Sequence, residues 1–355
     1  MTISLCMIVK NEEDVLQRCL ESIKESVDEI IIVDTGSTDA TKDIAKKYTD
    51  KVYDFDWIED FSAARNFSFE KASMDYCMWL DADDILSEHN SNQLKELKEN
   101  MQNVDVVMMK YSIQFDNSGN PVYSYYRERI LKNNGLYKWS GRVHEVIETF
   151  GNIVHSEIEI YHKKQKTGND NRNLRIYEKQ IEDKEDFSPR DMFYYGRELY
   201  YHERYSEASE MFEKFLEKDG WLENNIEACQ FLSYCYNNLK NEKRALDSLL
   251  RSFIYDSPRA EICCELGAFF FDRNLKQAIF WYETALTIPC NDKSGAFIIT
   301  DYYGFLPCIQ LCVLYDRMGD RDRAVFYNEQ AGKMKPESEA VAYNKEYFSR
   351  NTNEY

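Results

Sequence analysis

The segment Asp81-Ala82-Asp83-Asp84 places three carboxylates close together, directly after the apolar run 76–80. In open α/β sheets ligands bind at the carboxyl ends of strands, where this loop is expected to lie. Two carboxylates separated by one residue can share a hard cation such as Mn²⁺ or Mg²⁺, which takes its other ligands from water and substrate phosphates. The cation also stabilises a diphosphate leaving group. Alone, the pattern is equally typical of a solvated turn or a helix N-cap.

Asp34 follows a second apolar run, 29–33, and precedes Gly36, Ser37 and Thr38. A carboxylate at that strand end can accept a hydrogen bond from the imide N–H of a base, which uridine offers. Gly36 permits close approach of a ligand, and the two hydroxyl residues can cap the next helix. A strand, turn and cap without any ligand explain the same residues about as well.

Arg65 lies near the start of a helix-like segment, 60–71. A guanidinium at this position can pair with a phosphate or with the acidic loop. The alternative is an arginine on a helix surface.

Strand-like and helix-like stretches alternate around these residues, which indicates a mostly parallel sheet covered by helices on both faces. The strand-like stretches are 3–9, 29–33, 51–55 and 76–80, and the helix-like ones are 12–26, a segment ending near 47, and 60–71. An antiparallel hairpin of 104–113 and 122–131 around the turn 116–121, a strand at 153–162 and a linker at 163–172 are expected to follow.

From residue 173 the chain reads as helical, with a long-period repeat. Alanines recur at spacings of 37, 33 and 46 residues, each preceded by a small or apolar residue: Ala208, Ala245, Ala278 and Ala324 after Gly196, Ser233, Gly267 and Cys312. The pattern resembles tetratricopeptide repeats of about 34 residues, with an insertion near 290–305. An irregular helical domain is the alternative. The expected domains are 1–165, a linker and first helix at 166–188, and helical repeats at 189–355.

The composition limits the partners. A net charge of −19 disfavours binding to nucleic acid or to anionic membranes. Ten cysteines without metal-site spacing, several inside apolar runs, indicate reduced and buried thiols. We find no signal peptide and no run long enough to span a bilayer, so a cytoplasmic protein is expected.

Three motifs in this order resemble the family 2 glycosyltransferases: Val33-Asp-Thr-Gly-Ser-Thr-Asp39, Phe61-Ser-Ala-Ala-Arg-Asn66 and Leu80-Asp-Ala-Asp-Asp84, after an opening Met7-Ile-Val-Lys-Asn-Glu-Glu13. The resemblance covers about residues 3–165. It implies an α/β GT-A fold, Rossmann-like with a mostly parallel mixed sheet. It also implies a nucleotide sugar, expected to be a UDP-sugar, a divalent metal, and inversion at the anomeric carbon.

The resemblance assigns roles residue by residue. The nucleotide sugar would be held by Val9, Asn11, Glu12, Asp34, Gly36, Ser37, Arg65, Asp81 and Ala82. The metal would be held by Asp81 and Asp83, and a neutral imidazole of His144 or His162 could add a ligand. A structural, hydrogen-bonded histidine is the alternative for each.

A base must take the acceptor proton during direct displacement. Glu145 is the candidate and Asp84 its rival. Trp139 and Tyr137 could stack on a sugar face, although an ordinary loop anchor explains both rings as well.

Further motifs resemble the sublancin-type peptide S-glycosyltransferase subgroup, which carries a C-terminal tetratricopeptide domain: Gly141-Arg-Val-His-Glu145, Ile160-Tyr-His162, Arg172-Asn173 and Tyr195-Gly-Arg-Glu-Leu199. The subgroup's known enzyme has a further segment before its first strand, whereas this chain starts at the strand. The acceptor of that enzyme is therefore not simply assigned to this chain. A peptide or protein acceptor, S- or O-linked and engaged by the repeats, is expected, with a homodimer through the repeats as a further possibility. The alternatives are a cell-wall, capsule or other glycan acceptor, and a non-catalytic scaffold in which only the repeats function.

Overall fold

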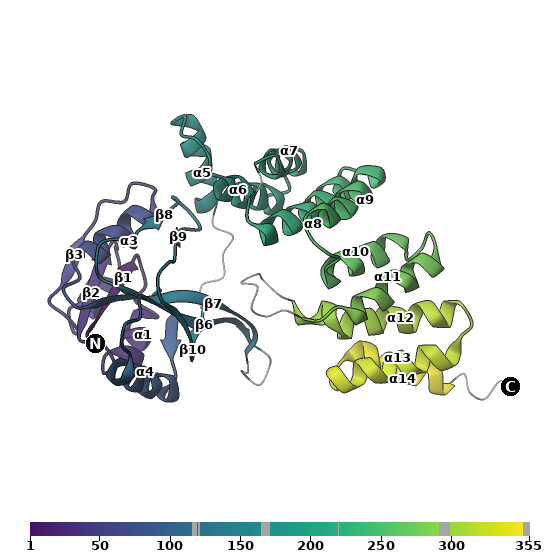
Figure 1. Ribbon diagram of the computed structural model, residues 1–355, viewed down its shortest axis with the longest axis horizontal. Coiled ribbons are helices and arrows are strands. Elements are labelled where there is room, and N and C mark those ends of the chain that lie inside the picture. The colour runs from purple at the N-terminus through teal and green to yellow at the C-terminus, as the bar shows by residue number, and fades with distance from the viewer. Residues whose placement is uncertain (116–118, 120, 165–170, 219, 291–298, 351–355) are drawn as a thin grey trace. The chain divides into compact units, whose positions relative to one another are not determined.

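The computed structural model describes residues 1–115, 119, 121–164, 171–218, 220–290 and 299–350 (Figure 1). The chain forms two compact units, Met1–Asp186 and Phe187–Tyr355. Parts of the expected turn, linker and insertion, at 116–118, 120, 165–170 and 291–298, lie outside the described residues. The division falls close to the expected start of the repeats at 189. The helix expected between the domains lies in the first unit, where Arg172 lies 4.7 Å from the Phe61 ring.

Unit 1 is built on an eight-stranded sheet of order β3-β2-β1-β4-β7-β6-β10-β5. Its strands are β1 (Ile3–Val9), β2 (Glu29–Asp34), β3 (Val52–Asp54), β4 (Tyr76–Trp79), β5 (Asp84–Leu86), β6 (Val106–Phe115), β7 (Pro121–Lys132) and β10 (Ile153–His162). A separate two-stranded ribbon pairs β8 (Trp139–Ser140) with β9 (Val146–Ile147). The expected parallel strands and antiparallel hairpin are confirmed, whereas β5 and the ribbon were not expected.

Strand direction decides which residues meet at one edge. Strands β1, β2 and β4 run parallel, so their carboxyl ends share an edge. Strand β7 is antiparallel to β4, β6 is antiparallel to β7, and β10 is parallel to β6. Two reversals cancel, so β10 also ends at the edge where β4 ends. There β10 pairs antiparallel with β5, which sets His162 opposite Asp84.

Helices cover both faces of this sheet: α1 (Leu16–Ile23), α2 (Thr41–Ala45), α3 (Phe61–Glu70) and α4 (Glu88–Asn100), with α5 (Arg172–Glu182) following. Alternate residues of β1 point to opposite faces. Leu5 and Met7 pack in the core that includes residues of α1 and α4, and Cys6 packs in the one beside α3. The helices are shorter than expected because turns replace their first and last residues.

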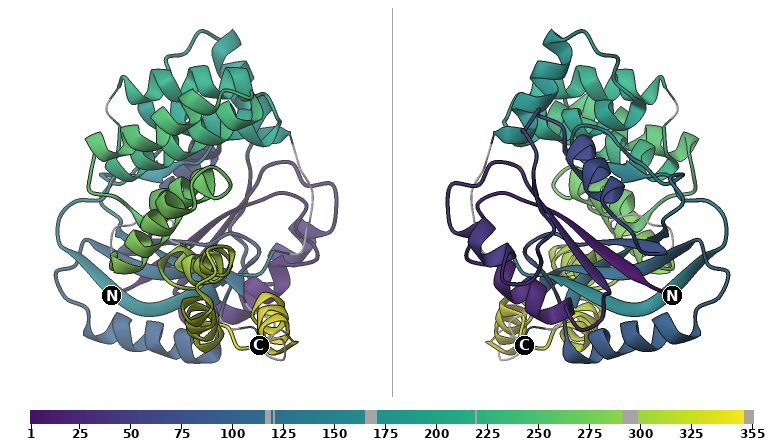
Figure 2. Two further views of the ribbon diagram at one scale, coloured as in Figure 1. Left: turned by 90° about the vertical axis from the view of Figure 1, so that its right-hand side faces the viewer. Right: turned by 90° about the vertical axis from the view of Figure 1, so that its left-hand side faces the viewer.

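Unit 2 consists of consecutive helical hairpins, stacked along the chain from teal to yellow in Figure 2. Its helices are α6 (Pro189–Tyr201), α7 (Tyr205–Leu216), α8 (Leu222–Asn238), α9 (Glu242–Arg251), α10 (Ala260–Phe270), α11 (Leu275–Thr287), α12 (Phe305–Arg317), α13 (Arg321–Met334) and α14 (Glu339–Arg350), with short 3₁₀ turns at Ser252–Ile254 and Thr300–Tyr303. The four repeat alanines are fully buried in the second helix of each of the first four hairpins. The expected tetratricopeptide-like repeats are therefore confirmed.

Small residues let the paired helices approach. A Cβ atom placed on Gly267 of α10 would lie 2.7 Å from the Tyr282 ring of α11. In the first hairpin a Cβ atom on Gly196 would lie 2.8 Å from the Phe212 ring. The glycine of one helix therefore accommodates an aromatic ring of the other, and the two hairpins use the same contact.

All ten cysteines are free, and all but Cys290 are buried, as expected for reduced thiols. Burial raises the pKa of the Cys263 thiol to about 12, which makes it a poor nucleophile. Among the described residues, no helix has the length and apolar character needed to cross a membrane.

We expect Gly267→Ala to destabilise the protein. Overpacking against the buried Tyr282 ring costs about 1–3 kcal/mol, which exceeds the roughly 1 kcal/mol usually gained when alanine replaces a helical glycine. Urea unfolding of the full chain measures the difference, and the double variant with Tyr282→Leu should lose most of the penalty. Higher stability of Gly267→Ala alone would show that the ring does not constrain this position.

Candidate active site

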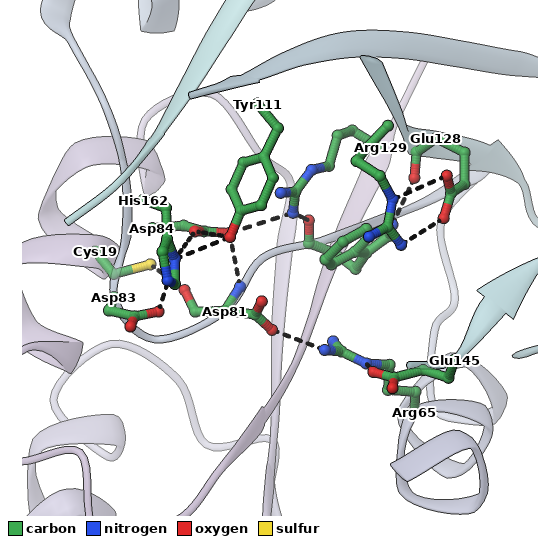
Figure 3. Close-up of polar contacts among 12 residues, drawn as sticks. Cys19, Arg65, Asp81, Asp83, Asp84, Tyr111, Glu128, Arg129, Glu145 and His162 are labelled. Atoms are coloured by element: carbon green, nitrogen blue, oxygen red, sulfur yellow. Dashed lines mark hydrogen bonds and ion pairs between the residues drawn. The ribbon is translucent and has the colours of Figure 1, made fainter. Parts of the chain in front are cut away.

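The carboxylate of Asp84 joins four parts of unit 1 (Figure 3). Its Oδ2 atom accepts hydrogen bonds from the backbone N–H of Asp81 at 3.0 Å and from Nη1 of Arg129 at 3.2 Å. Its Oδ1 atom accepts from the Tyr111 hydroxyl at 2.9 Å and contacts Nδ1 of His162 at 3.1 Å. The side chains of Asp84 and Arg129 have no exposed surface. The acidic loop, β6, β7 and β10 therefore meet on one buried carboxylate.

Arg65 links the acidic loop to Glu145. Its Nη2 atom donates to Oδ1 of Asp81 at 2.8 Å, and its Nε atom donates to Oε1 of Glu145 at 2.6 Å. The expected pairing of Arg65 with the acidic loop is thus present. The start of α3 is fixed by the Asp60 side chain, which accepts from Ala63 N–H. The N–H of Phe61 also donates to the Arg142 carbonyl, just before Glu145.

Two tryptophans support the Arg65 guanidinium from within the domain. Its central carbon lies 5.0 Å from the Trp79 ring and 4.8 Å from the Trp139 ring. Trp139 is held by Asn66, whose side chain exchanges two hydrogen bonds with the Trp139 backbone. The suggested sugar stacking stays a prediction for both rings: Trp139 is 3% exposed, and Tyr137 is 6% exposed and stacked on Phe150. Both rings are anchors of the loop.

Asp34 ends β2 with one oxygen engaged and one without a partner. Its Oδ1 atom accepts from the backbone N–H groups of Gly36 at 3.0 Å and Ser37 at 2.9 Å. Its Oδ2 atom is buried and receives no hydrogen bond from a described residue. Gly36 has a φ of +98° and open space at its missing Cβ. Because buried polar atoms are normally paired, Oδ2 is suited to accept from a ligand.

The other residues expected at the nucleotide organise the loops around Asp34. The backbone N–H of Asn11 donates to Ser37 Oγ at 2.9 Å, and that of Glu12 donates to Thr41 Oγ1 at 2.7 Å. The Val9 carbonyl accepts twice from Thr35, which ties the end of β1 to the residue after Asp34. Ala82 is buried within the acidic loop.

The charges around the acidic loop shift two carboxylates in opposite directions. Burial raises the pKa of Asp81, but the guanidiniums of Arg65 and Arg129 lower it to about 2. Burial raises the pKa of Asp83 above its usual value, and this rise persists although His162 opposes it. Burial lowers the pKa of His162, but its hydrogen bond to Asp84 and the charge of Asp83 raise it above 6.5 overall.

Asp83, Asp84 and His162 form a group whose potential ligand atoms lie within 4.8 Å of one another. Asp84 has both oxygens engaged, whereas the Asp83 side chain is 23% exposed. Oδ2 of Asp81 is available, since Arg65 takes only Oδ1. Carboxylate oxygens with one imidazole nitrogen fit Mn²⁺ or Mg²⁺. His144, one of the expected ligands, is not part of this group.

The two residues expected as the base, Glu145 and Asp84, differ in exposure. Asp84 has no exposed surface, so an acceptor cannot reach it, whereas the Glu145 side chain is 12% exposed. Tyr111 and Arg129 were missed in the sequence. The one available signal was Arg127-Glu128-Arg129, a charged run directly before the apolar end of a predicted strand.

Comparison with known proteins identifies a family and several relatives of this chain. Residues 4–198 match the sequence model described as Glycosyl transferase family 2. The SPbeta prophage-derived glycosyltransferase SunS of Bacillus subtilis is 29% identical over 227 residues, which are 60% of this chain and 53% of SunS. A TPR repeat-containing protein of Synechococcus elongatus is 35% identical over 146 residues, 41% of this chain and 35% of its own length. The chain thus spans between a third and about half of these relatives.

Among solved structures, the TPR protein YrrB, described as having an unusual peptide-binding site, aligns with 49% of this chain and 81% of its own. Its sequence identity is 19% and its TM-score 0.36, too low to carry an argument.

We expect Arg65→Met to lower the free energy of unfolding by about 3 kcal/mol at neutral pH, because two partly buried carboxylates lose their counter-ion. The lowered pKa of Asp81 contributes stability above its unfolded value of about 3.9, and that contribution is lost as the pH falls toward about 2. The gap between wild type and variant should therefore shrink below about pH 4.

Urea unfolding as a function of pH measures this gap. Arg175→Met is the matched control, because Arg175 pairs with Glu59 at 3.3 Å but its side chain is 65% exposed. The control should change stability by less than about 1 kcal/mol. Equal effects of the two variants would contradict the role given to Arg65.

Proposed function

Because the chain belongs to glycosyl transferase family 2, we propose that unit 1 transfers a sugar from a UDP-sugar to a peptide or protein acceptor, with inversion and with Mn²⁺ or Mg²⁺. The observation that carries the proposal is the Arg65 guanidinium, which joins Asp81 of the acidic loop to Glu145. This link brings the residue proposed to hold the donor together with the residue proposed as the base.

The donor's base would bind at Asp34. Its unpartnered Oδ2 atom is an acceptor for the imide N–H of uracil, and the open space beside Gly36 allows a ring to approach the backbone. The Gly36 and Ser37 N–H groups hold the other oxygen and so fix the plane of the carboxylate. This polarity favours uridine over cytidine, because cytosine presents an acceptor at the same ring position.

The diphosphate would bind beside the acidic loop. Asp81, Asp83 and His162 would hold the cation, which neutralises the charge that develops on the leaving diphosphate. Arg65 keeps the Asp81 carboxylate ionised, since the pKa of Asp81 is lowered to about 2. The same guanidinium places a positive charge beside the acidic loop, although Arg65 itself is buried.

Glu145 would remove the acceptor proton. Arg65 fixes its Oε1 atom, while Oε2 accepts no hydrogen bond from a described residue. Because a base must be reached by the acceptor, its 12% exposed side chain fits the role better than the fully buried Asp84. The acceptor atom would then attack the anomeric carbon on the side opposite the diphosphate.

The helical unit would engage the acceptor. Stacked hairpins form extended surfaces suited to a peptide chain, and the described part of unit 2 has four such hairpins before α14. The motifs that resemble the sublancin-type peptide S-glycosyltransferase subgroup favour a peptide acceptor. The acceptor remains part of the proposal because only 53% of the glycosyltransferase SunS is covered.

We expect Asp34→Asn to invert nucleotide preference. The Gly36 and Ser37 N–H groups require an oxygen at Oδ1, so the new amide NH₂ would replace Oδ2 and oppose the uracil imide N–H. UDP affinity should fall by about 10- to 100-fold, while CDP, whose ring nitrogen accepts, should bind relatively better. Calorimetry with Mn²⁺ measures both affinities, and an unchanged UDP-to-CDP ratio would contradict uracil binding at Asp34.

We expect Glu145→Gln to bind donor normally and to lose about 100- to 10,000-fold in transfer, because glutamine still accepts from Arg65 but cannot take a proton. Intact-mass analysis of candidate peptides with Mn²⁺ and a mixture of UDP-glucose, UDP-N-acetylglucosamine and UDP-galactose measures transfer. Glu148→Gln, at an exposed position nearby, is the control.

Wild-type turnover in Glu145→Gln would rule out its role as base. If no UDP-sugar binds to or is hydrolysed by the wild-type protein, the non-catalytic scaffold would be the better reading of the chain.

A further inference from the structure

Asp84, Arg129 and Tyr111 are buried polar groups that the proposed chemistry does not use. We propose that they form a positioning unit that holds His162 in the tautomer with hydrogen on Nδ1, so that the lone pair of Nε2 is free to bind a divalent cation. Asp84 is then neither the base nor a metal ligand.

The hydrogen bonds allow one arrangement of protons. The Tyr111 hydroxyl donates its only proton to Oδ1 of Asp84 at 2.9 Å. Its oxygen lies 2.9 Å from Nδ1 of His162 and can then only accept. Oδ1 of Asp84 lies 3.1 Å and Oδ1 of Asp83 3.3 Å from the same nitrogen, and both can also only accept while they are ionised. Nδ1 therefore carries the hydrogen, and in the neutral ring Nε2 is the acceptor.

Arg129 compensates the charge of Asp84. Its Nη1 atom donates to Oδ2 of Asp84 and to the Trp79 carbonyl, both at 3.2 Å. Its guanidinium carbon lies 3.7 Å from the Trp79 ring and 4.2 Å from the Tyr111 ring. Within the described chain, its Nε and Nη2 atoms have no hydrogen-bond partner. The Arg129 side chain therefore contacts one carboxylate and two aromatic rings, and none of its surface is exposed to substrate.

The backbone brings the same residues into register. Asp84 and His162 are paired residues of β5 and β10. The N–H of Lys163 donates to the Asp83 carbonyl at 2.9 Å, which ties the residue after His162 to the acidic loop. Arg18 of α1 donates to the Lys163 carbonyl. The imidazole thus has a fixed backbone and a fixed Nδ1, as is usual for histidines that bind metal through their other nitrogen.

Two measurements test the inference on the full chain. Long-range ¹H–¹⁵N NMR of histidine-labelled protein, at about pH 9 where imidazole is neutral, reports the tautomer of His162, whose signal is assigned with His162→Gln. Titration with Mn²⁺ alone, followed by the EPR signal of the free ion, reports metal affinity. The inference rests on the proposed metal-dependent function only for the second measurement.

In wild type we expect the Nδ1–H tautomer. In Asp84→Asn, the donors Arg129 and Asp81 N–H keep the amide oxygen at Oδ2, so an NH₂ group replaces Oδ1. The Tyr111 hydroxyl must then donate to Nδ1, which switches His162 to the Nε2–H tautomer and weakens Mn²⁺ binding by about 10- to 100-fold. Tyr111→Phe should keep the tautomer and weaken Mn²⁺ binding by about 10-fold.

Tyr126→Phe is the matched control, since its hydroxyl contacts the exposed Glu157 at 3.2 Å, and it should change neither measurement. An Nε2–H tautomer in wild type would overturn the inference, as would Mn²⁺ affinity in Tyr111→Phe equal to that of the control. If wild type binds no Mn²⁺, the proposed metal site fails, and the tautomer alone decides whether the positioning unit exists. These wild-type and Tyr111→Phe results remain decisive if Asp84→Asn does not fold.

Discussion

The ion pair between Asp84 and Arg129, from which solvent is excluded, is the interaction on which the rest of the site depends. Removing one partner of such a pair leaves an uncompensated charge, a cost of about 3–5 kcal/mol. The pair binds the backbone of Asp81, the last residue of β4 and, through Tyr111, the end of β10. Without it, the carboxylates of the acidic loop would repel one another and the loop would have no fixed position.

A second arginine, Arg65, extends this arrangement toward the solvent. Arg65 is 8% exposed and joins Asp81 to Glu145, so the same charge keeps one carboxylate ionised and orients the other. The acidic loop therefore has a buried side, fixed by Arg129, and a solvent-facing side, fixed by Arg65. This is how a protein of net charge −19 holds several carboxylates at one sheet edge and still leaves Asp83 and His162 accessible.

Much of this could be predicted from sequence patterns, and the exceptions have physical causes. Apolar runs and repeated small residues predicted the sheet, the hairpin and the stacked helices. These elements show in the sequence because their buried side chains recur at regular spacings along the chain. The three-residue strand β5 was missed, since it exists only by pairing with β10. Arg129 was missed because its burial depends on Trp79 and Tyr111, two residues distant in sequence.

The central claim is that this sheet edge holds a uridine diphosphate and a divalent cation together. Anomalous diffraction at the manganese edge, from crystals grown with UDP and Mn²⁺, tests it most directly. The account predicts one manganese peak bound by Asp83 and by Nε2 of His162, with the uracil imide donating to Oδ2 of Asp34. Manganese bound elsewhere, or a uracil that makes no contact with Asp34, would contradict it.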